Sequence, residues 1–296
     1  MTPDWLKSLN AEQPVLIAGP TASGKSALAL EVAATQGGVI VNADALQVFA
    51  NWRILTARPG RDEESLAPHR LYGHVAGDAT YSVGQWLRDL APLLSGARPI
   101  LVGGTGLYFT ALTEGLADIP PTPAGIRARA SARLQQEDLA AMLTELDAAT
   151  LARIDTANPM RVQRAWEVWQ TTGRGLAAWQ DDTPAPLLAL KDAQPLLIEA
   201  DRDWLTARIE RRFDAMIANG ALEEVRHNLA DWNPANPSSR AIGAPELIDH
   251  LRGNRNLKDA VDAAKTATRQ YAKRQRTWFR SRMGGWRSIL LPRLLA

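Results

Sequence analysis

Residues 19–26 read Gly19-Pro20-Thr21-Ala22-Ser23-Gly24-Lys25-Ser26, which matches the pattern G-x-x-x-x-G-K-[ST]. The stretch lies between an apolar run, 15–18, and an Ala- and Leu-rich run, so we expect a strand before it and a helix after it. Backbone N–H groups around Gly24 form a concavity for oxyanions, and the positive end of the following helix points into it. Lys25 can reach the terminal phosphate oxygens, and the Ser26 hydroxyl is placed to bind Mg²⁺. The sequence therefore predicts a site for a phosphate-bearing ligand.

The composition is typical of a globular enzyme, with 46% hydrophobic residues, 22% charged residues and a net charge of +2 among 296 residues. No apolar stretch is long enough to cross a bilayer and the N-terminus lacks a signal pattern, so we expect a cytoplasmic protein without a membrane partner. The absence of cysteine excludes disulfides, thiolate catalysis and cysteine zinc sites. The four histidines lack metal-ligand spacing, which leaves phosphate-bound Mg²⁺ as the expected metal.

Apolar segments alternate with helical patterns in the first part of the chain. We predict strands at 15–18, 39–42 and 99–102, and helices at 25–35 and 83–94. This alternation favours the α/β class: a parallel sheet of the P-loop NTPase type, flanked by helices on both faces.

A proline-rich hinge at 119–123 interrupts this pattern. The stretch that follows, as far as Trp179, reads as helix throughout, and a strand predicted at 195–199 resumes the sheet. We expect residues 1–118 and 195–296 to form a catalytic core with C-terminal helices, and residues 119–194 to form an all-helical insertion domain. The predicted C-terminal helices are 202–218, 222–229 and 257–282.

Polar or glycine-rich segments follow two further predicted strands. Asp44 comes just after 39–42, and Gly103-Gly104-Thr105-Gly106 follows 99–102. Ligands of open α/β sheets bind beyond the carboxyl ends of the strands, so these segments converge with the phosphate loop on one edge. Asp44 could accept a proton from an attacking group, bind Mg²⁺ or be a solvated turn residue. Thr105 offers a hydroxyl to a leaving-group oxygen.

The charges are distributed unevenly along the chain, because no acidic residue follows Asp262 while lysines and arginines recur. The basic residues at positions i, i+4, i+7 and i+11 of the predicted helix 257–282 share one face. These are Arg269, Lys273, Arg276 and Arg280, and further basic sites stand at Arg127, Arg129, Arg133, Arg161 and Arg164. A single arginine could be a solvated charge or a diphosphate clamp, but the set predicts a groove for an RNA backbone.

Six segments together resemble the bacterial tRNA dimethylallyltransferases. They are 19–26, 42–49, 56–59, 68–71, 102–108 and 267–278. The resemblance extends from Val15 to Trp278, whereas general P-loop kinases share only the first segment. Members of this family transfer a dimethylallyl group from its diphosphate to N6 of the adenosine that lies 3′ of the tRNA anticodon.

The resemblance implies a role for each matching residue. Asp44 would be the general base on N6, and Thr105 would donate to the bridging oxygen of the departing diphosphate. Residues 19–26 would bind diphosphate and Mg²⁺ rather than ATP, Arg212 would contact the diphosphate, and Thr21 would support activity. Together with the basic face, the positions expected at tRNA are Asp44, Ala45, Leu46, Gln47, Thr105, Arg127, Met160, Arg161, Val162, Gln163, Arg164, Arg240, Ala241, Ile242, Gly243, Ala244, Pro245, Arg269, Lys273 and Arg276.

Two positions depart from the family pattern. Ala45 stands where a serine is usual, and Ala244-Pro245-Glu246 replaces an aromatic residue, a basic residue and a glutamine. Neither departure touches the diphosphate site, but the second alters one expected tRNA contact.

Three other interpretations fit part of the sequence. A P-loop nucleotide or small-metabolite kinase has no use for the long basic helix, and an adenine-nucleotide prenyltransferase needs little of the helical insertion. A non-catalytic RNA-binding protein leaves Asp44 and Thr105 without roles. We therefore predict a Mg²⁺-dependent tRNA dimethylallyltransferase that binds dimethylallyl diphosphate and the tRNA anticodon stem-loop, and that works as a monomer.

Overall fold

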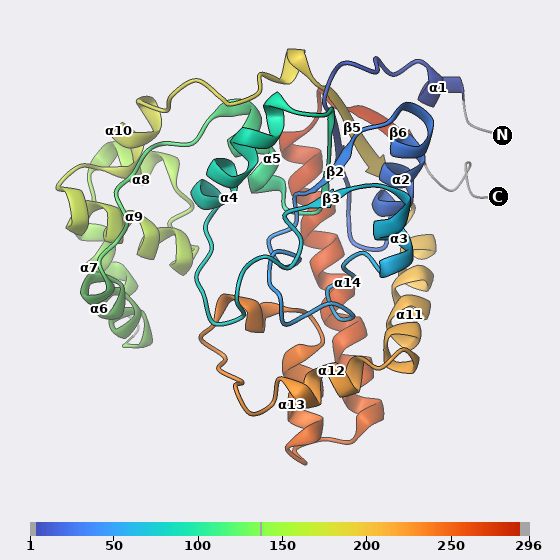
Figure 1. Cartoon of the computed structure of the whole chain (residues 1–296). Helices are drawn as coiled ribbons and strands as arrows, with labels where there is room; N and C mark the ends of the chain where they lie inside the picture. Colours follow the sequence, from blue (N-terminus) through green and yellow to red (C-terminus); the bar gives the residue numbers. More distant parts are fainter. Residues whose placement is uncertain (1–3, 137, 291–296) are drawn as a thin grey trace. The chain divides into compact units, whose positions relative to one another are not determined.

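The computed structural model describes residues 4–136 and 138–290 and contains a six-stranded parallel sheet (Figure 1). The strand order is β3-β2-β4-β1-β5-β6. The strands are β1 (Val15–Ala18), β2 (Val39–Asn42), β3 (His69–Arg70), β4 (Pro99–Gly103), β5 (Gln194–Glu199) and β6 (Arg287–Leu290). The predicted α/β fold is confirmed, and the structure adds the short edge strands β3 and β6 to the four that the sequence indicated.

The chain divides into two compact units, Met1–Thr113 with Leu187–Ala296, and Glu114–Pro186. The helices of the first unit are α1 (Asp4–Lys7), α2 (Lys25–Gln36), α3 (Arg61–Leu66), α4 (Val83–Leu90), α5 (Gly106–Glu114), α11 (Arg202–Ala218), α12 (Ala221–His227), α13 (Ala244–Leu251) and α14 (Leu257–Arg282). The helices of the second unit are α6 (Ala124–Gln135), α7 (Leu139–Thr144), α8 (Ala148–Arg153), α9 (Pro159–Thr172) and α10 (Leu176–Asp181).

The second unit is helical, but the expectation of helix throughout was wrong. Side chains that cap new helices interrupt the run: Asp147 accepts the N–H of Thr150, and Asn158 accepts the N–H of Met160. Gly173, in the left-handed conformation at φ +65°, ends α9. Asp147 and Asn158, which composition alone would place inside a long helix, therefore stand at the starts of α8 and α9.

Alternate strand residues of the sheet pack against helices on opposite faces. Val15 and Ile17 of β1 belong to a buried cluster with Leu28 of α2. Leu16, between them, belongs to a second cluster with Trp86 of α4, and this cluster also takes in α5 and the C-terminal end of α14. The expectation of helices on both faces is therefore confirmed.

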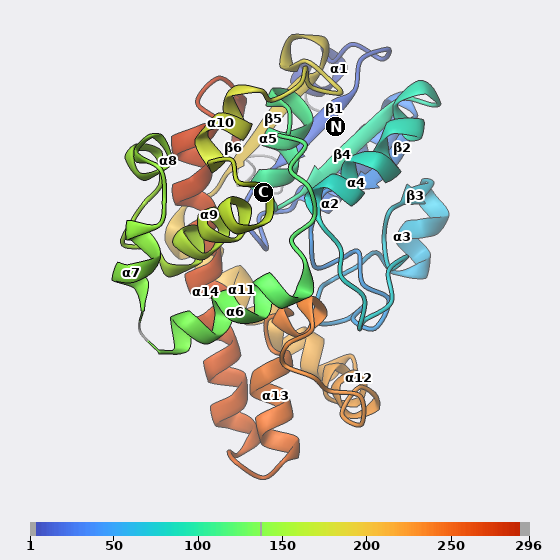
Figure 2. The ribbon, with the colours of Figure 1, turned by 90° about the vertical axis from the view of Figure 1, so that its left-hand side faces the viewer.

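A third buried cluster lies beyond the sheet, where α13 and the N-terminal half of α14 run side by side (Figures 1 and 2). It joins these helices to α12, to Phe213 and Met216 of α11, and to Trp52 and Leu55 of a loop that precedes α3. The cluster fixes the loop and α11 against each other, and both contribute to the site described below. None of the helices in the described ranges has the length and apolarity needed to cross a bilayer.

Candidate active site

The phosphate loop connects β1 to α2 in the arrangement that its sequence predicts. Gly24 has φ +96°, a conformation that residues with a side chain rarely adopt, and α2 begins at the next residue. The ammonium of Lys25 turns back over the loop and donates to the carbonyl of Pro20 at 2.7 Å. Ser26 is exposed on the same cavity as Lys25. The loop thus presents both polar side chains of the motif to a ligand.

A cavity of about 350 Å³ opens beyond the carboxyl ends of β1 and β2. Residues 21–26 form one wall, and Asp44, Arg208 and Arg212 line it from other elements. The remaining polar residues on the cavity are Gln47, Thr56, Arg58, Glu63 and Tyr72. The basic side chains on the cavity outnumber the acidic ones, which suits an anionic ligand. The basic residues are Lys25, Arg58, Arg208 and Arg212, and the acidic ones are Asp44 and Glu63.

Two basic side chains of this cavity, Lys25 and Arg212, are partly removed from water. Burial lowers the pKa of Lys25 to about 7, with Asp44 acting in the opposite direction and Arg212 adding to the decrease. Burial also lowers the pKa of Arg212, again against the effect of Asp44. A diphosphate in the cavity would therefore meet poorly solvated cations, which bind an anion more strongly than solvated ones.

Two arginines of α11 approach the phosphate loop from one helical face. Nη2 of Arg212 donates to the hydroxyl of Thr21 at 3.2 Å, and Nε of Arg208 donates to the carbonyl of Ala22 at 3.0 Å. The resemblance picked out Arg212 alone. The spacing of the two arginines could have predicted that Arg208 also faces the phosphate loop, because residues four positions apart share a helix face.

The carboxylate of Asp44 is fixed by its own turn. Oδ1 accepts the N–H of Leu46 at 2.9 Å, and the N–H of Asp44 donates to the side-chain oxygen of Asn42 at 2.8 Å. Asn42 in turn donates to the carbonyl of Asp44 at 2.9 Å. With Oδ1 engaged, Oδ2 is the oxygen that remains to accept a proton from a ligand.

Thr105 lies beside Asp44 and supports its turn. Its hydroxyl accepts the N–H of Ala45 at 2.9 Å, and its own N–H donates to the carbonyl of Ala43. A Cβ on the neighbouring Gly103 would lie 2.0 Å from that same carbonyl oxygen, so only glycine permits this close approach. Within the described part of the chain, Thr105 is not among the residues that line the phosphate cavity.

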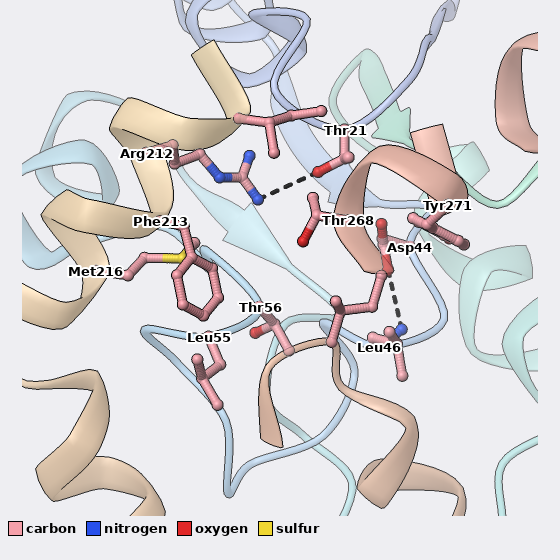
Figure 3. Close-up of a pocket in the computed structure, with 12 residues that line it drawn as sticks. Thr21, Asp44, Leu46, Leu55, Thr56, Arg212, Phe213, Met216, Thr268 and Tyr271 are labelled. Atoms are coloured by element: carbon pink, nitrogen blue, oxygen red, sulfur yellow. Dashed lines mark hydrogen bonds between the residues drawn. The ribbon is translucent and has the colours of Figure 1, made fainter. Parts of the chain in front are cut away.

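A smaller pocket of about 50 Å³, with six apolar residues among the twelve that line it, adjoins the phosphate cavity (Figure 3). The two share Thr21, Asp44, Thr56 and Arg212, so these polar residues stand where the pocket and the cavity meet. The apolar walls of the pocket are Leu46, Leu55, Ile209, Phe213, Met216 and Ile242, and α14 adds Thr268 and Tyr271. This arrangement suits a small apolar group attached to a phosphate ester, with a carboxylate at the junction.

Gln275 of α14 joins two loops of the site. Its Oε1 accepts the N–H of Thr21 at 2.8 Å, and its Nε2 donates to the carbonyl of Gly104 at 2.9 Å. The side chain is buried, so it acts as a bridge rather than a surface contact. Gln275 belongs to the segment 267–278 that carries the family resemblance, but no local pattern in that segment indicates this bridge.

The segment 240–245 is divided between surface and core. Arg240 and Pro245 are exposed and Ile242 lines the apolar pocket, while Ala241 and Ala244 are fully buried. The departure from the family pattern has a local explanation, because Pro245 stands in the first turn of α13 and Glu246 accepts the N–H of Gly243.

The candidate tRNA positions of the second unit fall into two groups. Arg127, Arg161 and Arg164 are exposed, as is Met160 at 62%. Val162 and Gln163 are buried, and Gln163 donates to the carboxylate of Glu167 at 2.9 Å. The buried pair therefore supports the helix that presents the exposed residues.

The basic residues of α14 lie along one groove, as their spacing predicts. Arg269, Lys273, Arg276 and Arg280 line an open groove of about 650 Å³ between α14 and α11. Arg269 pairs with Glu210 of α11 at 3.0 Å, which offsets part of the positive charge. Lys273 and Arg280 are exposed and available to a polyanion.

Comparison with known proteins identifies relatives along nearly the whole chain. The family model described as IPP transferase matches residues 47–282. A protein of Cereibacter sphaeroides named tRNA dimethylallyltransferase is 62% identical over 288 residues, covering 97% of this chain and 92% of its own. A protein of the same name from Roseobacter denitrificans is 64% identical over 280 residues, covering 94% and 99%.

Solved structures show the same architecture. A full-length tRNA isopentenylpyrophosphate transferase from Bacillus halodurans is 31% identical with a TM-score of 0.67, and the match covers 95% of this chain and 90% of that one. A eukaryotic dimethylallyltransferase, described as acting on tRNA, is 26% identical with a TM-score of 0.76 over 90% and 69% of the chains.

Proposed function

The chain belongs to the IPP transferase family, and we propose that it transfers a dimethylallyl group from dimethylallyl diphosphate to tRNA. The acceptor is N6 of the adenosine 3′ of the anticodon, and diphosphate is released. One observation carries the proposal: a pocket with an apolar wall of six residues and a phosphate cavity meet at Asp44. A prenyl diphosphate has this same division into an apolar and an anionic part, and its reactive carbon lies where the two parts join.

The phosphate cavity would hold the diphosphate of the donor. The N–H groups of the phosphate loop, Lys25, Arg208 and Arg212 supply the positive charge, and the apolar pocket takes the dimethylallyl group. These cations stabilise the leaving group as negative charge accumulates on it.

Magnesium fits this cavity as an ion bound together with phosphate. Ser26 places a hydroxyl on it, while the described residues contain no cluster of three or more acidic or histidine side chains that could hold a metal without further ligands. Ser26 would therefore hold Mg²⁺ with oxygens of the diphosphate and water, as hard oxygen ligands suit this ion. When bound, the ion supplies further neutralisation of the diphosphate.

The chemical step forms a bond from N6 of adenosine to C1 of the dimethylallyl group and breaks the bond from C1 to oxygen. The electron pair of the broken bond stays on the diphosphate, and the N6 proton passes to Asp44. An exocyclic amine of adenine is a weak nucleophile, so proton removal as the new bond forms is the contribution expected of the carboxylate. Thr105 would act by holding the Asp44 turn, because its hydroxyl accepts the N–H of Ala45.

The acceptor is a base within a tRNA loop, so the adenosine must leave its stack to reach Asp44. The RNA backbone would bind to the basic groove of α14 and to the exposed arginines of the helical insertion, which are Arg127, Arg161 and Arg164. We also propose that the protein acts as a monomer in the cytoplasm.

Mass spectrometry of anticodon-loop nucleosides tests this function. Cells that contain the protein should yield N6-dimethylallyl adenosine in tRNA, and cells that lack it should not. An unchanged nucleoside profile would contradict the proposal. A kinase is the less supported alternative, because the pocket next to the phosphate cavity has an apolar wall and the relatives are named tRNA dimethylallyltransferases rather than kinases.

A further inference from the structure

The carboxylate of Glu224, on α12, accepts three consecutive backbone N–H groups. Its Oε1 lies 2.6 Å from the nitrogen of Arg53 and 2.8 Å from that of Ile54, and its Oε2 lies 3.0 Å from that of Leu55. A carboxylate takes this place because all of its lone pairs are acceptors. Charge-assisted bonds of this kind are stronger than those between neutral groups.

The loop that Glu224 binds is fastened on its other side by a residue of the active site. Nε2 of Gln47 donates to the carbonyls of Thr56 and Ala57 at 2.8 and 3.1 Å. Within the loop, the hydroxyl of Thr56 donates to the carbonyl of Trp52. Glu224 therefore holds the N–H side of this turn, and Gln47 holds its carbonyl side next to the Asp44 turn.

The same loop forms part of both ligand cavities. Leu55 lines the apolar pocket, where Figure 3 shows it beside Phe213, and Thr56 lines both the pocket and the phosphate cavity. A movement of the backbone at residues 53–55 would carry both side chains with it. Leu55 and Thr56 are two of the twelve residues that line the pocket, so a small displacement of both alters its fit to a five-carbon group.

We propose that Glu224 is a positioning residue for the prenyl donor: by binding three N–H groups, it sets the loop that presents Leu55 and Thr56. The identity of the donor rests on the proposed function. Glu224 touches neither cavity within the described part of the chain, so it acts through the loop rather than on the ligand.

Glu224→Gln is the discriminating variant, because it preserves size while replacing one acceptor oxygen by a donor NH₂. Whichever way the amide is turned, at least one of the three N–H groups then faces another donor. We expect KM and Kd for dimethylallyl diphosphate to rise about 10- to 100-fold, with kcat and tRNA affinity changing far less. Glu224→Asp keeps both acceptor oxygens on a shorter side chain and should give an intermediate rise.

Glu223→Gln is the matched control, since it removes the same charge from the neighbouring residue of the same helix. Glu223 is exposed and pairs with Arg226 rather than with the loop. This control should keep the wild-type donor KM. Thermal melts of all three variants report the folded fraction, and donor affinity is expressed per folded protein.

A wild-type donor KM in Glu224→Gln would overturn the inference. So would a loss of kcat that follows the folded fraction while KM is unchanged, because that result indicates a purely structural role. If the wild-type protein bound the donor without modifying tRNA, the proposed function would fail by itself. The donor Kd of Glu224→Gln, measured by calorimetry, would still decide the role of this residue.

Discussion

Oε1 of Gln275 lies 2.8 Å from the backbone nitrogen of Thr21, across 254 residues of sequence. The same side chain donates to the carbonyl of Gly104. The helix that carries the basic groove is thereby joined to the phosphate loop and to the loop after β4. A Cβ on Gly104 would lie 2.3 Å from Nε2 of Gln275. The position of the Gln275 side chain therefore explains why residue 104 is a glycine.

We expect Gln275→Leu to destabilise the protein and to slow the reaction. The substitution leaves a buried N–H and a buried carbonyl without partners, at a cost of about 2 kcal/mol in the free energy of unfolding. Urea denaturation measures this cost. Arg274→Leu, at the adjacent exposed position, is the control and should change the stability little; equal stability of the two variants would contradict the bridge.

Asp44→Asn should impair chemistry while leaving RNA binding intact. The amide oxygen can still accept the N–H of Leu46, so the turn survives while the base is lost. We expect the single-turnover rate of prenyl transfer to fall about 10²- to 10⁴-fold. Rapid-quench measurements at saturating donor provide the rate, and filter binding provides the tRNA Kd. A variant that reacts at the wild-type rate would exclude Asp44 as the base.

Arg212→Gln and Arg208→Gln should each weaken donor binding. Loss of one charge-assisted contact to the diphosphate weakens the free energy of donor binding by about 2 kcal/mol, which corresponds to roughly a 30-fold rise in donor KM. Arg211→Gln is the control, because Arg211 is exposed and does not line the phosphate cavity in the described residues. If Arg208→Gln behaved like this control, Arg208 would have no place in the diphosphate site.

Much of this site could be predicted from local sequence. The phosphate loop and Asp44 belong to short segments next to strands, and the C-terminal half of α14 carries a basic stripe from Arg269 to Arg280. Arg208, Gln275 and Glu224 act through contacts with residues at least 169 positions away, which no local pattern encodes.

The same limit applies to the fold. The four central strands are apolar runs, whereas β3 has only His69 and Arg70 and is too short to show an alternation. In β6, only Ile289 is buried, so its sequence reads as surface. Pairing with β2 and β5, rather than composition, makes these segments strands.

Donor affinity should fall as the pH rises above neutrality. In the free protein Lys25 is protonated below its pKa of about 7 and neutral above it. A bound diphosphate favours the ammonium and raises this pKa, so binding at higher pH takes up a proton. The affinity for dimethylallyl diphosphate is therefore greatest below about pH 7, and it falls by up to about tenfold for each pH unit above that value.

Isothermal titration calorimetry in buffers of different ionisation enthalpy measures that proton uptake. Lys25→Arg should bind without it, because a guanidinium stays protonated throughout this range. A wild-type affinity that is constant between about pH 7 and 9 would be inconsistent with a desolvated Lys25 on the diphosphate.

The most direct measurement is transfer of radiolabelled dimethylallyl groups from their diphosphate to purified tRNA, run beside an identical reaction that contains γ-labelled ATP. We expect label on N6 of the adenosine 3′ of the anticodon, one diphosphate released for each group transferred, and no phosphate transfer from ATP. Label passing from ATP to an acceptor, with tRNA left unmodified, would contradict the proposed function.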